Sequence, residues 1–447
     1  MSNPKRKRYN VAVVERVAWR SGLILTAILL PLDRLPDGIA RPLLWLSLVL
    51  LLVRPIYQLR APTQLWQRLT GRRELAVSFG LGAVGVAAWA SVPGALDPQI
   101  AAAAAMTLSW LLLRAWLVAI WSDQSDLAVL AKSVIGIGLA VVALGWIQAV
   151  ADLAGWPASV TGLLPRYSHT ATFVVPRPQA TALEPLYLAH YLFIPLGLLL
   201  ALWPGRQRRQ LVGAAIVAVI SLIVATGSRG GLLGLLAVSL VAGLAWLWQR
   251  PGGRKLGLSL TIVGGLVLAG FGTGIWWQYR DQPVTQNVKI ERTWQSAVGH
   301  YLDFNDRSAN TRYELWPEAI EQWQAHPWLG VGLYNSRLAL HEAIWRTGTP
   351  IAQLQPLNND YLAWLAETGV LGMAGLLTLF SILVIAIRSA WQRWQAWSSG
   401  WSLAMAAMAV QALTFHSILL LRTWVVIGAI LAAWVAGQTV KRSKDTL

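Results

Sequence analysis

The 447-residue chain contains no cysteine and few charged residues. Without cysteine, a disulfide framework, a thiolate metal site and a cysteine nucleophile are all excluded. Asp, Glu, Lys and Arg make up only 13% of the residues, whereas soluble domains carry roughly 25%. Hydrophobic residues make up 55%, and the mean hydropathy is +0.50. This composition excludes a disordered chain, a nucleic-acid-binding domain and an ordinary soluble enzyme, and it predicts an all-α polytopic membrane protein.

Apolar runs of membrane-spanning length recur along most of the chain. A helix needs about 20 residues to cross the hydrocarbon core of a bilayer. On that basis we expect about twelve transmembrane helices in a single membrane domain, residues 1–447. Their expected centres are 23–30, 43–53, 75–90, 101–120, 127–150, 182–202, 211–225, 232–248, 256–277, 370–387, 403–416 and 423–436.

The net charge of +17 is distributed in short patches between the apolar runs, which argues against nucleic acid as a partner. If the N-terminus is inside, more than half of the 37 Lys and Arg residues fall in cytoplasmic segments, namely 5–16, 54–73, 206–209, 250–255, 388–393 and 441–444. This asymmetry predicts that both termini are cytoplasmic, with the anionic inner leaflet as a partner. The turn 122–126 departs from the pattern, because it holds two aspartates and no basic residue.

Two of the expected outer segments are long. The smaller spans residues 151–181, and the larger, residues 278–357, would form a periplasmic loop. Loops longer than about 15 residues usually carry function or are disordered. Trp316, Ile320 and Trp323 recur at helical spacing in the larger loop, which predicts a structured cap with amphipathic helices on the membrane.

Two arginines in these outer segments are candidate anion-binding residues. Arg229 lies in the tight turn Thr-Gly-Ser-Arg-Gly-Gly at 226–231, where glycines permit sharp geometry and let a ligand approach the backbone. A helix starting there would add a positive field. Arg312 opens the amphipathic stretch of the large loop. The alternatives are that Arg229 extends to lipid headgroups and that Arg312 forms a surface ion pair with Glu314 or Glu318.

The sequence predicts less about three other arginines in the expected outer segments. Arg166 and Arg177 lie in the smaller loop, and we expect both to be solvated. Arg422 precedes the last apolar run, and the sequence leaves open whether it lines a site or extends to the lipid headgroups.

Carboxylate and amide side chains mark the starts of two expected spans. Glu184 precedes Pro185 at the sixth span, where it is either a functional carboxylate or a stabiliser of the helix start. Asn358, Asn359 and Asp360 precede the tenth span. One of the two asparagines is expected to cap a helix, with Asp360 as the anion of its first turn.

The sequence indicates neither a metal nor a cofactor. Its six histidines include no pair at the i, i+4 spacing of a helical metal site. Walker, Rossmann and nucleophile-elbow motifs are also missing, so we expect no nucleotide chemistry.

Three segments together resemble the O-antigen ligase and Wzy-type polymerase superfamily. They are the Ser-Arg-Gly turn within 225–231, the Arg-to-Trp helix and His-Pro-x-x-Gly-x-Gly turn within 311–332, and the Asn-Asn-Asp-Tyr-Leu and Glu-x-Gly-x-x-Gly run within 358–372. Glu184 and Pro185 with Ala189 are similar to a weaker motif of the family. The resemblance covers roughly residues 127–388 and lies on one expected face of the membrane.

This resemblance implies a GT-C-like membrane fold and a metal-independent glycosyltransferase of the bacterial inner membrane. The donor would be a glycan on undecaprenyl pyrophosphate, and the acceptor a lipid A core, a growing polysaccharide or a protein. The family's two pyrophosphate-binding arginines match Arg229 and Arg312. Guanidinium groups suit that role, because they neutralise the charge that develops on the leaving diphosphate.

The chain departs from the family at one position. The family's acceptor-activating histidine matches Asn358, which can orient a hydroxyl but cannot accept its proton. Asp360, Glu184 and His341 are then the candidate bases. Two other classes compete with glycan transfer: a transporter of a small anionic solute such as bicarbonate, and a structural scaffold. The chain shows no internal repeat of the kind many transporters contain.

Overall fold

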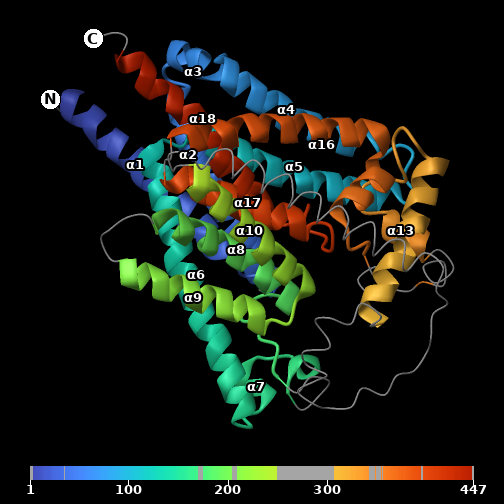
Figure 1. The fold of residues 1–447 in the computed structure, drawn as a ribbon. Coiled ribbons are helices and arrows are strands. Elements are labelled where there is room, and N and C mark those ends of the chain that lie inside the picture. Colours follow the sequence, from blue (N-terminus) through green and yellow to red (C-terminus); the bar gives the residue numbers. More distant parts are fainter. Residues whose placement is uncertain are drawn as a thin grey trace.

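The computed structural model describes residues 4–34, 36–169, 175–203, 209–248, 307–341, 348, 354, 356–393 and 396–444. Within these residues every regular element is helical, with fifteen α-helices and one short 3₁₀ turn. The predicted all-α class is therefore confirmed (Figure 1).

Five of the described helices are long and apolar enough to cross a membrane: α2 (Asp37–Gln58), α5 (Pro98–Trp121), α6 (Gln124–Leu153), α8 (Pro185–Leu202) and α16 (Asp360–Arg393). Shorter apolar stretches lie in α9 (Arg209–Ala225), α10 (Arg229–Trp248) and α18 (Leu421–Lys444). Helices α1 (Pro4–Leu29), α4 (Arg72–Ala90) and α17 (Ala396–Gln411) occupy three further predicted positions. A polytopic membrane protein is confirmed. The span expected at 256–277 lies outside the described residues.

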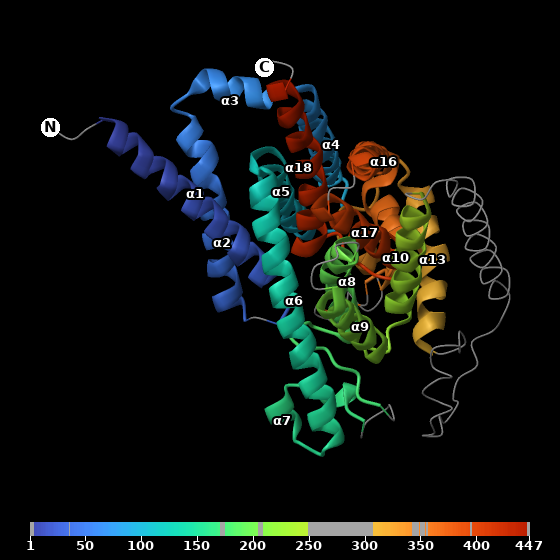
Figure 2. The same ribbon diagram turned by 60° about the vertical axis from the view of Figure 1, so that its left-hand side comes forward.

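The helices alternate in direction, so their connections collect at two ends of the bundle. One end, called the site end below, holds the described residues of the connections that lie within 30–34, 91–97, 154–169, 175–184, 226–228, 326–341, 356–359 and 412–420. Hydrogen bonds tie these connections together, for example from Leu96 N to Val331 O at 3.1 Å and from Thr181 Oγ1 to Pro31 O at 2.8 Å. The first turn of α1 and the last turn of α18 both lie toward the opposite end of the bundle (Figure 1), and Figure 2 shows them well apart from each other.

Helix α8 lies in the middle of the bundle and packs on α17, α9, α6 and α10 (Figure 2). Its contact with α17 is close because glycines meet there. A Cβ atom at Gly197 would lie 2.5 Å from the carbonyl oxygen of Gly400. Small residues allow such backbone approach in membrane helices. This packing fixes the start of α8, and therefore Glu184, at the site end.

The acidic turn at 122–126 is neutralised by arginines from other helices. Asp126 is fully buried and accepts hydrogen bonds from Arg54 of α2 and, at 3.2 Å, from Arg20 of α1. Arg54 also binds Glu15 at 2.6 Å. The turn needs no basic residue of its own, because Arg20 and Arg54, about 70 to 100 residues earlier in the chain, neutralise Asp126.

Candidate functional site

The turn around Arg229 has the geometry that the sequence predicts. Gly227 adopts φ = +64°, which reverses the chain directly after α9. Ser228 caps the next helix, because its Oγ accepts a hydrogen bond from Gly231 N at 3.0 Å. Arg229 is the first residue of α10 and is half-buried. Its guanidinium is therefore carried by the positive end of a 20-residue helix.

The two glycines after Arg229 serve helix packing. A Cβ atom at Gly230 would lie 2.5 Å from Thr414 Oγ1, and one at Gly231 would lie 3.0 Å from Ala189 Cβ. They let α10 start in close contact with α8 and with the 412–420 connection. The sequence interpretation, which gave the glycines to an approaching ligand, missed this packing role.

Arg177 is not solvated, and that expectation was wrong. Its Nε donates to Thr226 O at 2.8 Å, and its Nη2 donates to Gly227 O at 3.1 Å. Carbonyl groups at the end of α9 lack intrahelical partners, so they are natural acceptors for an arginine. The smaller loop thus holds the Arg229 turn in place.

Glu184 occupies the N-cap position of α8, with Pro185 as the first helical residue. Its side chain makes no capping hydrogen bond. It pairs instead with Arg166, at 3.0 Å from Nη2 to Oε1, and both side chains stay accessible, at 59% exposed for Arg166 and 38% for Glu184. Arg166 is therefore exposed, as expected, and the Glu184 carboxylate faces solvent at the site end.

Asn359 and Asp360 both have structural partners. Asn359 Oδ1 accepts from the backbone N–H groups of Tyr361 and Leu362 at 3.1 Å, so Asn359 is the N-cap of α16. The Asp360 carboxylate accepts from Ser417 N at 2.9 Å, from Ser417 Oγ and from Ile418 N at 3.3 Å. It ties α16 to the 412–420 connection. These contacts favour a first-turn structural role for Asp360 over that of a base, while Asn358 is half-buried beside it.

The sequence interpretation missed three further residues near Asp360. His416 Nδ1 lies 3.4 Å from Asp360 Oδ1, and the His416 ring lies 5.9 Å from that of Tyr334. The Arg337 guanidinium stacks 3.6 Å above the Tyr334 ring. Tyr334 and Arg337 belong to the 326–341 connection and His416 to the 412–420 connection, and no spacing in the sequence joins these two segments.

The His-Pro-x-x-Gly-x-Gly and Glu-x-Gly segments pack backbone to backbone. Val331 N donates to Ala366 O at 2.9 Å, and Gly332 N donates to Glu367 O at 3.0 Å. Gly330 and Gly369 both have positive φ. A Cβ atom at Gly330 would lie 2.3 Å from the carbonyl carbon of Glu367. The motif glycines are therefore structural; the backbone carbonyl of His326 accepts from Gly330 N at 3.0 Å, and the His326 side chain is exposed.

Arg312 lies in α13 (Arg307–Ala325), the helix predicted for the larger loop. Leu315 and Ala319 form its buried face, packed on Leu357, Ala363 and Ala366. Trp316 is only partly buried and Ile320 is 39% exposed, so the buried face begins one residue before the predicted tryptophan stripe. The Arg312 side chain lies outside the described residues. In both views the lower end of α13 lies at the same end of the bundle as the start of α10 (Figures 1 and 2).

Arg422 and His341 take different positions. Arg422 is 1% exposed, binds Asp33 Oδ2 through Nη1 and Nη2 at 3.0 Å each, and donates to His190 Nδ1 at 3.1 Å. It is a structural connection between α18, α8 and the 30–36 segment. His341 ends α14 (Ser336–Leu340), and its Nε2 has no hydrogen-bond partner among the described residues.

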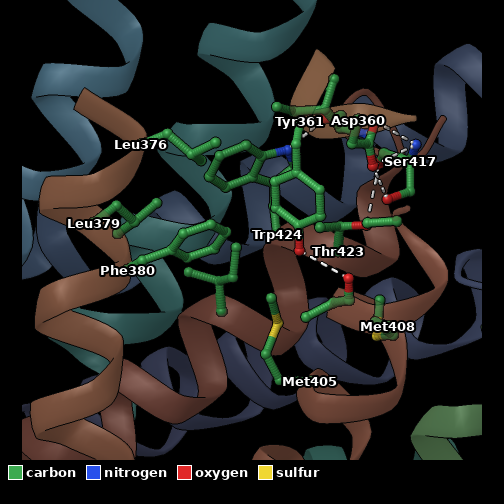
Figure 3. A pocket seen from close by; sticks show the side chains of 14 residues that line it. Asp360, Tyr361, Leu376, Leu379, Phe380, Met405, Met408, Ser417, Thr423 and Trp424 are labelled. Atoms are coloured by element: carbon green, nitrogen blue, oxygen red, sulfur yellow. Dashed lines mark hydrogen bonds between the residues drawn. The ribbon is translucent and has the colours of Figure 1, made fainter. Parts of the chain in front are cut away.

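Asp360 also borders a small apolar cavity of about 50 Å³ between α16, α17 and α18. Figure 3 shows Asp360 and Ser417 at one end of it and Phe380, Met405 and Trp424 below them. Asp360 is the only carboxylate in its lining, which is otherwise mainly apolar. In the described part of the chain no cluster of three His, Asp or Glu residues could hold a metal ion.

The fold and these positions define a multi-pass helical membrane protein with polar and cationic side chains gathered at one end. The family model for O-antigen ligase (Wzy_C) matches residues 213–377. This segment is a Wzy_C domain, the domain of O-antigen ligase family enzymes, which act at the inner membrane in polysaccharide and lipopolysaccharide biosynthesis. The predicted family is thereby confirmed over a segment that includes Arg229, Arg312 and Asn358, but neither Glu184 nor His416. No curated protein matches the chain.

Proposed function

We propose that the protein transfers a glycan from undecaprenyl pyrophosphate to an acceptor hydroxyl at the outer face of the bacterial inner membrane. Arg229 and Arg312 bind the pyrophosphate, and no metal takes part. The observation that carries this proposal is the placement of Arg229 in the first turn of α10, at the same end of the bundle as the helix that carries Arg312.

The proposed reaction is a direct displacement. The acceptor oxygen forms a bond to the anomeric carbon, the bond from that carbon to the phosphate oxygen breaks, and the electron pair leaves with the diphosphate. Guanidinium groups stabilise that developing charge most effectively in a water-poor site. The N-terminal end of α10 adds to the same positive field. One displacement inverts the anomeric configuration.

Asn358 and Glu184 are the acceptor-side candidates. The amide of Asn358 can orient the hydroxyl, and a carboxylate can take its proton. Glu184 suits the second role better than Asp360, because its carboxylate is 38% exposed at the site end, whereas that of Asp360 is saturated with hydrogen bonds from Ser417 and Ile418.

In the proposed orientation the site end faces the periplasm and both termini face the cytoplasm. The distribution of Lys and Arg supports this, because the basic segments 5–16, 54–73 and 388–393 lie at the end opposite Arg229. The described parts of the two predicted outer loops, 154–169, 175–181 and 326–341, then lie on the periplasmic side. The acceptor is a lipid A core, a growing polysaccharide or a protein.

The test uses purified protein in liposomes with a lipid-linked glycan and an acceptor. Arg229→Ala and Arg312→Ala should each lower the transfer rate at least about 100-fold, because each removes a charge-assisted contact to the leaving group. Arg388→Ala is the matched control, since Arg388 is exposed at the opposite end of α16. Wild-type rates in both site variants would refute the proposal. Flux of an anionic solute without glycan transfer would instead favour a transporter.

A further inference from the structure

Arg337 is a buried cation for which the described residues provide no hydrogen-bonding partner. The residue is 6% exposed, yet no hydrogen bond or ion pair joins its guanidinium to any described residue. Its main contact is the Tyr334 ring, 3.6 Å below it. A cation–π contact offsets only part of the cost of removing a charge from water. Five N–H donors of Arg337 therefore remain available to an anion.

His416 presents a second unpartnered group to the same region. Its side chain is 10% exposed, and both ring nitrogens lack a hydrogen-bond partner among the described residues. The 3.4 Å from Nδ1 to Asp360 Oδ1 is too long for a good hydrogen bond. Burial, and next the charge of Arg337, lower the pKa of His416 to about 4. Arg337 and His416 thus both lie against the Tyr334 ring, and their N–H groups make no hydrogen bond to a described residue.

The backbone holds Tyr334 in a conformation that a side chain rarely adopts. Its φ of +68° lies in the left-handed region, although it is not glycine. The surrounding turn fixes it, through Asn335 N to Gly332 O at 3.0 Å and Leu333 N to Ser91 Oγ at 3.1 Å. Such strain persists only where neighbouring contacts enforce it, and it is concentrated at functional sites. The nearby acid Glu367 accepts a hydrogen bond from Ser336 Oγ at 2.6 Å, and the charge of Arg337 acts on it, but the two form no ion pair in the described residues.

The 412–420 connection carries His416 and also contacts the Arg229 turn. His416 lies two residues after Thr414, the residue against which Gly230 packs. We propose that Arg337, backed by Tyr334 and His416, forms an anion subsite of the same site and holds one phosphate of the donor diphosphate. This assignment rests on the proposed function. The subsite explains why this buried arginine has no ion-pair partner among the described residues: its partner arrives with the substrate.

The test compares Arg337→Met with Arg388→Met in purified protein, with inorganic pyrophosphate as the probe. Arg337→Met should weaken pyrophosphate binding at least tenfold and leave the melting temperature unchanged or raised, since it removes an unpaired buried charge. A structural arginine would show the reverse, namely a lower melting temperature with binding preserved in the folded fraction. That result, or wild-type pyrophosphate binding, would overturn the proposal.

Transfer kinetics then separate the possible sources of the phosphate. A raised KM for the lipid-linked donor alone supports the donor diphosphate, whereas a raised KM for a phosphorylated acceptor alone overturns that assignment. Because pyrophosphate binding is measured without turnover, it tests the subsite independently of the reaction. Loss of binding in Arg337→Met, with no glycan transfer by the wild type, would retain the subsite and refute the proposed function.

Discussion

The Arg177 guanidinium lies directly against Gly227: a Cβ atom there would be 2.7 Å from Arg177 Nε. Arg177 also donates to the carbonyl oxygens of Thr226 and Gly227. Arg177 therefore fits against the turn only because residue 227 has no side chain, and Arg177 in turn holds the turn in place. Positioning of Arg229 is shared between the smaller loop and the α9–α10 turn.

Gly227→Ala should consequently impair both stability and transfer. The substitution forces an L-residue to φ = +64° and displaces Arg177, which together cost about 1–3 kcal/mol. Gly94→Ala, where a Cβ meets nothing within 4 Å, is the control. Thermal unfolding in detergent and transfer assays measure both effects. If Gly227→Ala had the same melting temperature and transfer rate as Gly94→Ala, the turn at Gly227 would not have the role assigned to it.

Gly369→Ala should destabilise the protein without touching the proposed substrate groups. Gly369 has φ = +64°, and a Cβ there would lie 2.4 Å from the carbonyl of Trp328. Neither backbone can yield easily, so we expect a loss of about 2 kcal/mol or more. Gly136→Ala in α6 meets open space and serves as the comparison. A melting temperature for Gly369→Ala equal to that of Gly136→Ala would show that the two motif segments do not depend on this contact.

Arg422→Gln should unfold the site end. Arg422 is 1% exposed and binds Asp33 through two nitrogens, so its loss leaves a partly buried carboxylate without a partner, at a cost of about 3–5 kcal/mol. Arg337→Met should have the opposite effect on stability. Measuring both melting temperatures under one condition separates the two kinds of buried arginine. A stable Arg422→Gln variant would contradict this distinction.

The contribution of His416 to stability should fall in mild acid. Its pKa is lowered to about 4 by burial and by Arg337, whereas the unfolded chain has the ordinary value of about 6.5. Between these values the unfolded state binds a proton at His416 and the folded state does not, so the contribution of His416 to stability is full above about pH 6.5 and declines as the pH falls toward 4. Asp360, Arg337 and Tyr334 are the charged and titratable groups that face His416.

His416→Gln should reduce that decline. Unfolding midpoints of the wild type and this variant, measured between pH 7 and pH 4, provide the test. Parallel curves would show that another group causes the acid sensitivity.

Local patterns in the sequence predicted most of the helices and the immediate surroundings of the motif residues. Hydropathy located the spans, and the residue types at 226–231 and 358–360 predicted a turn before a helix and an asparagine cap. These features depend on contacts between residues a few positions apart, such as Ser228 with Gly231 and Asn359 with Tyr361.

The rest depends on contacts between distant segments. Arg177 reaches carbonyl groups 49 and 50 residues later in the chain, and Asp360 binds Ser417 across 57 residues. Nothing near Arg337 or His416 in the sequence marks them as neighbours. Packing of the connections at the site end brings Arg337 and His416 together, and this tertiary contact cannot be predicted from their spacing in the sequence.

The most direct test of the central claim is a double-mutant cycle on donor affinity with Arg229→Ala, Arg312→Ala and the double variant. If both guanidinium groups hold one diphosphate, each single variant should weaken binding of the lipid-linked donor at least about tenfold, and the double variant should deviate from the product of the single effects. Donor affinity equal to that of the wild type in either single variant would contradict the account.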